Sequence, residues 1–138
     1  MTNLGKPPDF DAVVIGAGFA GLGMLRRLRD EDGMSVQVYE TGDGVGGTWY
    51  WNRYPGARCD SESYVYCFSF SKELLQDWDW SGKYPEQPEI LSYLNHVADR
   101  FDLRRNIQFN TRVTSARYLE DTSLWEVETD QGDRVTAQ

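Results

Sequence analysis

The sequence contains little of what disulfide frameworks and most zinc sites are built from. Its 138 residues include two cysteines and one histidine. Two cysteines, Cys59 and Cys67, are too few for a disulfide framework, and reduced thiols are typical of a cytoplasmic protein. His96 has no second histidine and no cysteine near it in the sequence, so we expect no metal site.

Positive charge and long apolar runs are also scarce. The 14 lysines and arginines are outnumbered by 22 aspartates and glutamates, which leaves a formal net charge of −8. Because nonspecific nucleic-acid binding requires a basic surface, we expect no nucleic-acid partner. No apolar run reaches the length of about 18 residues that a membrane-spanning helix needs, so we expect no membrane partner either.

The length of the chain allows one domain and is too short for two ordinary ones. The N-terminal stretch MTNLGKPPDFD lacks the apolar core and the cleavage site of a secretory signal. Residues 1–9 are mostly polar and contain two adjacent prolines, which favours a flexible leader. We therefore expect the folded domain to occupy residues 10–138.

The first 40 residues predict a strand, a helix and a second strand. Residues 10–15 form a short, β-branched apolar run that ends at a glycine, as in a buried strand of a parallel sheet. Residues 19–30 carry leucines at helical spacing, and residues 35–40 form the next strand. This order is a βαβ unit. The arginines of the helix are expected on its outer face: Arg26, Arg27 and Arg29.

The second half of the chain predicts one long helix and four short strands. Proline and glutamate at 88–89 suit the first turn of a helix that continues to Phe101. Residues 107–109 follow as a third strand. Three strand candidates separated by polar turns then predict an antiparallel meander: residues 113–119, 124–129 and 134–137. The fold class expected is α/β, with a Rossmann-like βαβ unit and an antiparallel β-meander.

A glycine motif lies where the first strand ends and the helix begins. Gly16-Ala17-Gly18-Phe19-Ala20-Gly21 is a G-x-G-x-x-G, and Glu40 closes the second strand. Gly16 permits a tight turn, Gly18 lets the backbone approach a pyrophosphate, and Gly21 lets helix and strand pack closely. A carboxylate at Glu40 suits ribose hydroxyls and disfavours a 2′-phosphate, which indicates FAD or NAD. The alternative is a glycine-rich turn with a solvated Glu40.

A second glycine motif is rich in aromatic residues and spans residues 44–60. Gly46 and Gly47 again allow a close backbone approach to a ligand. The aromatic run Trp49-Tyr50-Trp51 offers flat surfaces that suit a planar ring system. The alternative is an aromatic cluster in the core with an ordinary turn after it.

These motifs resemble the N-terminal FAD-binding part of Baeyer–Villiger monooxygenases, close to the phenylacetone and cyclohexanone types. The resemblance rests on GAGFAG, VYE and GVGGTWYWNRYPGARCD, and it covers nearly the whole chain after residue 9. It implies a flavin-dependent enzyme that uses NADPH and O₂ to convert a ketone into an ester or lactone. It also implies roles for particular residues.

By this resemblance, Gly16, Gly18, Phe19, Ala20 and Gly21 line the FAD pyrophosphate, and Glu40 holds the adenosine ribose. Thr48, Trp49, Tyr50, Trp51 and Tyr66 lie along the flavin half, and Val113 meets adenine through its backbone. Arg58, Cys59 and Asp60 face the nicotinamide cofactor. Asp60 has the catalytic role, since it pairs with an active-site arginine from a later part of the chain.

Other motifs of the family are missing from the sequence. A second G-x-G-x-x-G for NADPH and an F-x-G-x-x-x-H-x-x-x-W motif do not occur. We therefore expect residues 10–138 to be an incomplete FAD-binding domain, inactive alone, with the rest of the polypeptide following Gln138. Two alternatives stay open. One is a flavin monooxygenase that oxidises nitrogen or sulfur, and the other is a truncated, non-catalytic dinucleotide-binding module.

Overall fold

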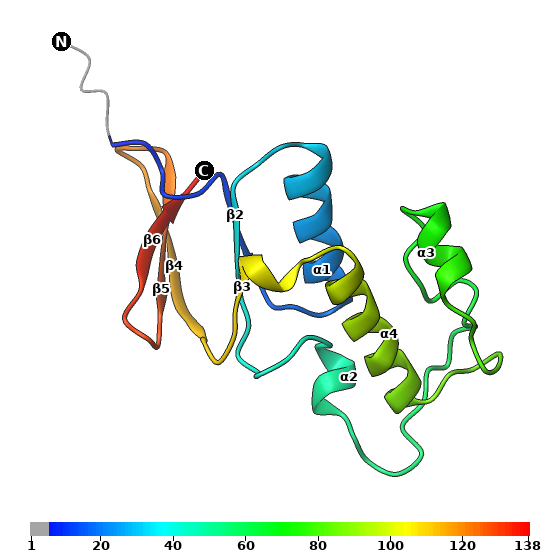
Figure 1. Ribbon diagram of the computed structural model, residues 1–138. Coiled ribbons are helices and arrows are strands. Elements are labelled where there is room, and N and C mark those ends of the chain that lie inside the picture. The colour runs from blue at the N-terminus through cyan, green and yellow to red at the C-terminus, as the bar shows by residue number, and fades with distance from the viewer. Residues whose placement is uncertain (1–5) are drawn as a thin grey trace.

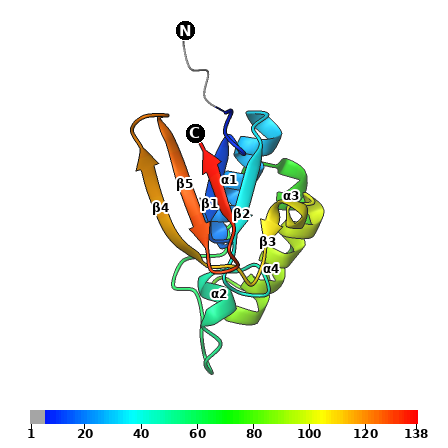
Figure 2. The ribbon, with the colours of Figure 1, turned by 90° about the vertical axis from the view of Figure 1, so that its left-hand side faces the viewer.

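The computed structural model describes residues 6–138 in three layers (Figure 1). A parallel sheet lies between the antiparallel meander on one side and the helices α1 and α4 on the other. Figure 2 shows the same arrangement with the meander toward the viewer. Residues 1–5, which make up most of the predicted leader, lie outside the described residues.

The parallel sheet confirms the predicted βαβ unit. Strands β1 (Ala12–Ile15), β2 (Val36–Tyr39) and β3 (Ile107–Gln108) pair in the order β1-β2-β3, and helix α1 (Phe19–Arg26) connects the first two. A π-helical turn, η1 (Arg27–Glu31), extends α1. The prediction of a buried first strand is wrong: Ala12, Val13 and Val14 are only partly buried, and Ile15 is 64% exposed. Strand β1 pairs only with β2 among the described strands, so one of its edges is open.

Helix α4 (Gln87–Arg100) supplies much of the core, as its apolar stripe predicted. Its buried apolar residues are Ile90, Tyr93, Leu94, Val97 and Ala98. They belong to one cluster with Leu22 and Leu25 of α1 and with Val36 and Val38 of β2. Burial raises the pKa of Tyr93 to about 12, and its hydroxyl accepts a 2.9 Å hydrogen bond from the Phe68 amide. The shorter helices are α2 (Thr48–Trp51), α3 (Lys72–Asp77) and η2 (Arg104–Asn106).

The meander has the predicted strands, β4 (Val113–Leu119), β5 (Leu124–Thr129) and β6 (Arg134–Ala137). An apolar groove of about 320 Å³ lies between its inner face and β1, and Ile15 and Trp125 line it. The Asp9 carboxylate accepts a 2.9 Å hydrogen bond from the Thr136 amide. Within residues 6–138, no helix is both long enough and apolar enough to cross a membrane.

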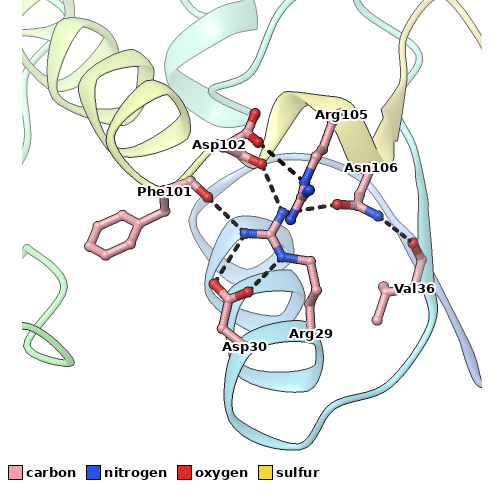
Figure 3. Close-up of polar contacts among 7 residues, drawn as sticks. All are labelled: Arg29, Asp30, Val36, Phe101, Asp102, Arg105 and Asn106. Carbon is pink, nitrogen blue, oxygen red and sulfur yellow. Dashed lines mark hydrogen bonds and ion pairs between the residues drawn. The ribbon is translucent and has the colours of Figure 1, made fainter.

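Two of the three helix arginines point inward, which corrects the expectation of an outer face. The side chain of Arg29 is 12% exposed, and its guanidinium donates to the carbonyls of Phe101 at 2.7 Å and Asp102 at 2.8 Å (Figure 3). It also donates to the Asn106 side chain at 2.9 Å. The guanidinium of Arg26 lies 4.4 Å from the ring centroid of Phe70. Helix C-termini leave carbonyls without partners, and Arg29 satisfies those beyond α4.

We expect Arg29→Ala to destabilise the fold, because it removes a buried cation that satisfies carbonyls beyond α4. The expected loss is about 2–4 kcal/mol in the free energy of unfolding, measured by urea denaturation. Arg134→Ala is the matched control, since Arg134 pairs with Glu128 at the surface with its side chain 66% exposed. The control should lose less than about 1 kcal/mol. Equal losses would contradict the role given to Arg29.

Candidate functional site

A polar cleft of about 460 Å³ opens at the carboxyl ends of β1 and β2. In open α/β sheets, ligands bind beyond the carboxyl ends of the strands. Six of the predicted site residues line this cleft: Gly16, Gly18, Glu40, Thr48, Trp51 and Val113. The other lining residues are Ile15, Tyr39, Thr41, Gly47, Asn52 and Arg112.

Two glycine-containing loops touch backbone to backbone at the cleft. A Cβ on Gly18 would lie 3.3 Å from the Cα of Gly47, and one on Gly47 would lie 2.9 Å from the Cα of Gly18. The Gly46 amide donates to the Ala17 carbonyl at 3.0 Å, which joins the loops. A Cβ on Gly21 would lie 1.9 Å from the carbonyl oxygen of Gly16, so only glycine fits there. The two motifs seen in the sequence thus form one surface.

Glu40 is buried at the end of β2 and is 5% exposed, which excludes the alternative of a solvated side chain. Its Oε2 accepts a 2.7 Å hydrogen bond from the Ala17 amide, and its Oε1 accepts one of 2.8 Å from the Gly42 amide. Each carboxylate oxygen has more than one lone pair, so the side chain can accept further hydrogen bonds from a ligand in the cleft.

The aromatic run at 49–51 divides between the cleft and the core. Trp51 is 59% exposed and lines the cleft, whereas Trp49 is 8% exposed and belongs to the core cluster. The Trp49 indole donates to the Tyr66 hydroxyl at 3.0 Å, and the Tyr66 ring lies 4.8 Å from that of Phe19. The interpretation as a core aromatic cluster therefore holds for Trp49, whereas Trp51 lies where a ligand in the cleft could reach it.

The other predicted residues near these helices do not line the cleft. Tyr50 packs edge-to-face on Trp51 at 4.6 Å, and its hydroxyl donates to the Asp43 carboxylate. Phe19 is partly buried in the aromatic cluster, and Ala20 is exposed on α1.

Arg58, Cys59 and Asp60 lie together in a second hollow. This hollow measures about 390 Å³, is shallow, and includes Tyr84. The Arg58 guanidinium pairs with the Glu86 carboxylate and donates to the Tyr84 carbonyl at 3.2 Å. Asp60 is exposed and forms no ion pair within residues 6–138. Arg58, Cys59 and Asp60 therefore lie together, as predicted, but they do not line the cleft.

Neither cysteine is placed for metal binding or ready oxidation. Cys59 is buried, its sulfur accepts a hydrogen bond from the Ser61 amide at 3.4 Å, and both thiols are free. Burial raises the pKa of the Cys67 thiol, which keeps it protonated at neutral pH. In the part of the chain that the structure describes, no group of three or more potential ligands could hold a metal ion.

Sequence reasoning assigned no role to several residues that line the cleft, among them Arg112 and Tyr39. Arg112 is the cationic residue that lines the cleft. Its backbone amide donates to the Asp130 carboxylate at 2.9 Å, and its carbonyl accepts from the Asp130 amide at 2.9 Å. Its position beside Val113 is the signal that could have found it. Tyr39 also lines the cleft but is almost fully buried. This burial, together with the charges of Asp133 and Asp9, raises the pKa of its phenol.

Comparisons with known proteins first define the class of this site. The family model described as an NAD(P)-binding Rossmann-like domain matches residues 14–79. This stretch contains the end of β1 together with α1, β2 and α2, and most of the residues that line the cleft lie in it. The site therefore lies in a Rossmann-like dinucleotide-binding unit, as its glycine motif predicted.

Three curated relatives extend the similarity to nearly the whole chain. A Baeyer–Villiger monooxygenase of Pseudooceanicola batsensis is 58% identical over 94% of this chain and 24% of its own length. The phenazine N-monooxygenase PhzNO1 of Lysobacter antibioticus is 50% identical over 94% of this chain and 24% of its own. The FAD-binding monooxygenase VdtE of Byssochlamys spectabilis is 44% identical over 93% and 22%.

The solved structures agree with these relatives. The crystal structure of cyclohexanone monooxygenase from Rhodococcus sp. Phi1 bound to NADP⁺ superposes with a TM-score of 0.91 and 57% sequence identity, over 96% of this chain and 25% of that one. The predicted resemblance to Baeyer–Villiger monooxygenases is confirmed. The chain spans about a quarter of the length of the relatives that it matches.

We expect Gly47→Ala to distort the cleft, because Gly47 has a φ of +54° and a Cβ there would meet Gly18. Its ψ is −121°, so the backbone lies outside the regions that alanine adopts readily. This strain alone costs alanine about 1–3 kcal/mol, and the collision adds to the loss. Gly82→Ala is the control, since nothing lies within 4 Å of a Cβ at that position. Urea denaturation should show a loss of stability only for Gly47→Ala, and an unchanged midpoint would contradict the contact between the loops.

Proposed function

We propose that this chain binds FAD in the cleft at the carboxyl ends of β1 and β2. The observation that carries the proposal is the contact between Gly18 and Gly47, where a ligand can reach two bare backbones. Glu40 lies at the end of β2 and offers carboxylate oxygens to ribose hydroxyls. A side chain at either glycine would obstruct a pyrophosphate.

The charges around the cleft fit a dinucleotide. Gly18 is the N-cap of α1 and has no side chain with which to cap the helix amides, and the first turn contains no acidic residue. A helix N-terminus without a side-chain cap or a nearby acidic residue attracts phosphate through its free N–H groups and its partial positive charge. Arg112 adds a cation to the same cleft. The buried carboxylate of Glu40 favours a ribose without a 2′-phosphate, which favours FAD over NADP in this cleft.

The larger proposal is that the chain is the FAD-binding part of a flavin monooxygenase that uses NADPH and O₂ to convert ketones into esters or lactones. The named relatives and the cyclohexanone monooxygenase structure support it. FAD supplies the redox chemistry when bound, and the protein orients the reactants. We assign residues 10–138 to this FAD-binding domain, with the remaining domains on a longer polypeptide, and we place the enzyme in the cytoplasm.

The remaining predicted residues have roles in the same proposal. The backbone of Val113 contacts adenine, and Thr48 and Trp51 lie along the flavin half of the cofactor. The hollow that contains Arg58, Cys59 and Asp60 receives the nicotinamide cofactor. Asp60 orients an arginine from a later part of the polypeptide, and its exposed position leaves it accessible to such a partner.

Nitrogen oxidation is the second candidate. The phenazine N-monooxygenase is 50% identical to this chain over 94% of the chain and 24% of its own length. The same cofactor cleft is therefore compatible with a different oxygen acceptor.

Glu40→Gln in the full-length polypeptide tests the cofactor site. The amide group of glutamine places a donor against one of the two backbone amides and removes the charge that ribose hydroxyls prefer. We expect FAD affinity to fall by about tenfold or more, which corresponds to about 1.4 kcal/mol. Flavin absorbance after gel filtration and a fluorescence titration measure this change.

Glu120→Gln is the matched control, because Glu120 is exposed in the turn after β4. It makes the same chemical change away from the cleft and should leave FAD affinity unchanged. The proposal fails if wild-type protein binds no flavin, or if Glu40→Gln binds FAD as tightly as the wild type does.

A further inference from the structure

Gln87 is a buried polar residue at the first position of α4, and no role was predicted for it. It is 7% exposed. Its side-chain nitrogen Nε2 donates to the Trp49 carbonyl at 2.5 Å, and its backbone amide donates to the Ala57 carbonyl at 2.9 Å. One residue therefore joins the helix α2 to the segment 57–60.

Helix α2 depends on this side chain because it is only one turn long. The Gly47 carbonyl accepts from the amides of Tyr50 and Trp51, and the Thr48 carbonyl accepts from the Asn52 amide. The Trp49 carbonyl is the next in the series, and it accepts from the Gln87 side chain. Carbonyls in the last turn of a helix need a partner from outside that helix.

The segment 57–60 is attached to the residues at the start of α4. Arg58 and Glu86 form an antiparallel bridge, and the Cys59 amide donates to the Pro85 carbonyl at 2.9 Å. The residues just before α4 thus form a short ladder with the segment that contains Cys59. Helix α4 is firmly packed in the core, so it provides a rigid base for both attachments.

We propose that Gln87 is a positioning residue that keeps α2 in register with the segment 57–60. Helix α2 supplies Thr48 and Trp51 to the cleft, whereas Arg58 and Asp60 line the second hollow. The inference rests on the proposed function, in which the cleft holds FAD and the hollow receives NADPH. Gln87 would then fix the spacing between the residues that would hold FAD and those that would face NADPH, the source of the hydride that reduces the flavin.

The chemistry of the position favours glutamine. A glutamate would direct a carboxylate oxygen at the Trp49 carbonyl, so two acceptors would face each other. A methionine of similar length would fill the space but donate nothing. Either change leaves a buried carbonyl without its partner, which weakens the attachment of α2 to α4.

Gln87→Met in the full-length polypeptide is the test, with Gln76→Met, at an exposed position on α3, as the matched control. We expect Gln87→Met to retain FAD with an affinity within about twofold of the wild type. The rate of flavin reduction by NADPH, measured anaerobically by stopped-flow absorbance, should fall by about tenfold. The control should match the wild type in both measurements.

Hydrogen exchange provides a readout that does not depend on bound cofactor. The amides of Trp51 and Asn52 are expected to exchange about tenfold faster in Gln87→Met, because α2 is less well held. If Gln87→Met does not fold, Gln87→Leu removes the same donor without burying a charge and should give the same pattern.

Three results would separate the possible failures. Unchanged exchange at Trp51 and Asn52 would overturn the attachment itself. Faster exchange with an unchanged rate of flavin reduction would show a purely structural role and overturn the positioning role. A wild-type protein without flavin would defeat the proposed function, and the positioning role would fall with it, while the exchange comparison would still test the attachment of α2.

Discussion

The cleft depends on one buried carboxylate and the backbone around it. The two side-chain oxygens of Glu40 accept hydrogen bonds from the amides of Ala17 and Gly42, while its own amide donates to the Gln108 carbonyl at 2.9 Å. Its carbonyl accepts from the Thr111 amide at 2.9 Å. Burying a charge is costly unless hydrogen bonds compensate, and here the compensating donors belong to the loops that form the cleft. Glu40 therefore joins the loop after β1, the loop after β2 and the connection between β3 and β4.

Around Glu40, the glycines form the backbone surface of the cleft, whereas the aromatic residues are divided between the cleft and the core. Gly18 and Gly47 bring two backbones together at the cleft, and Trp51 borders the same space. Trp49 points the other way, into an aromatic cluster, so α2 is anchored by its core side. Gln87 adds a second anchor from α4. A helix of one turn can present residues to a ligand only because it is held in this way from behind.

The sequence was sufficient for features that depend on local pattern, and insufficient for those that depend on distant contacts. The βαβ unit and the meander follow from apolar periodicity and turn residues, and the position of Glu40 at the cleft follows from its place at the end of β2. The inward direction of Arg29 was not predictable, because its partners, such as the Phe101 carbonyl, lie over 70 residues away. For the same reason, sequence spacing could not assign Trp49 to the core and Trp51 to the cleft, since only the packing of α2 against α4 decides it.

The most direct test of this account is a crystal structure of the full-length polypeptide with FAD bound. The account predicts that the pyrophosphate lies against the backbone at Gly18 and Gly47 and that the hydroxyls of the adenosine ribose donate to the Glu40 carboxylate. A dinucleotide bound away from the cleft, or a ribose that makes no contact with Glu40, would contradict it.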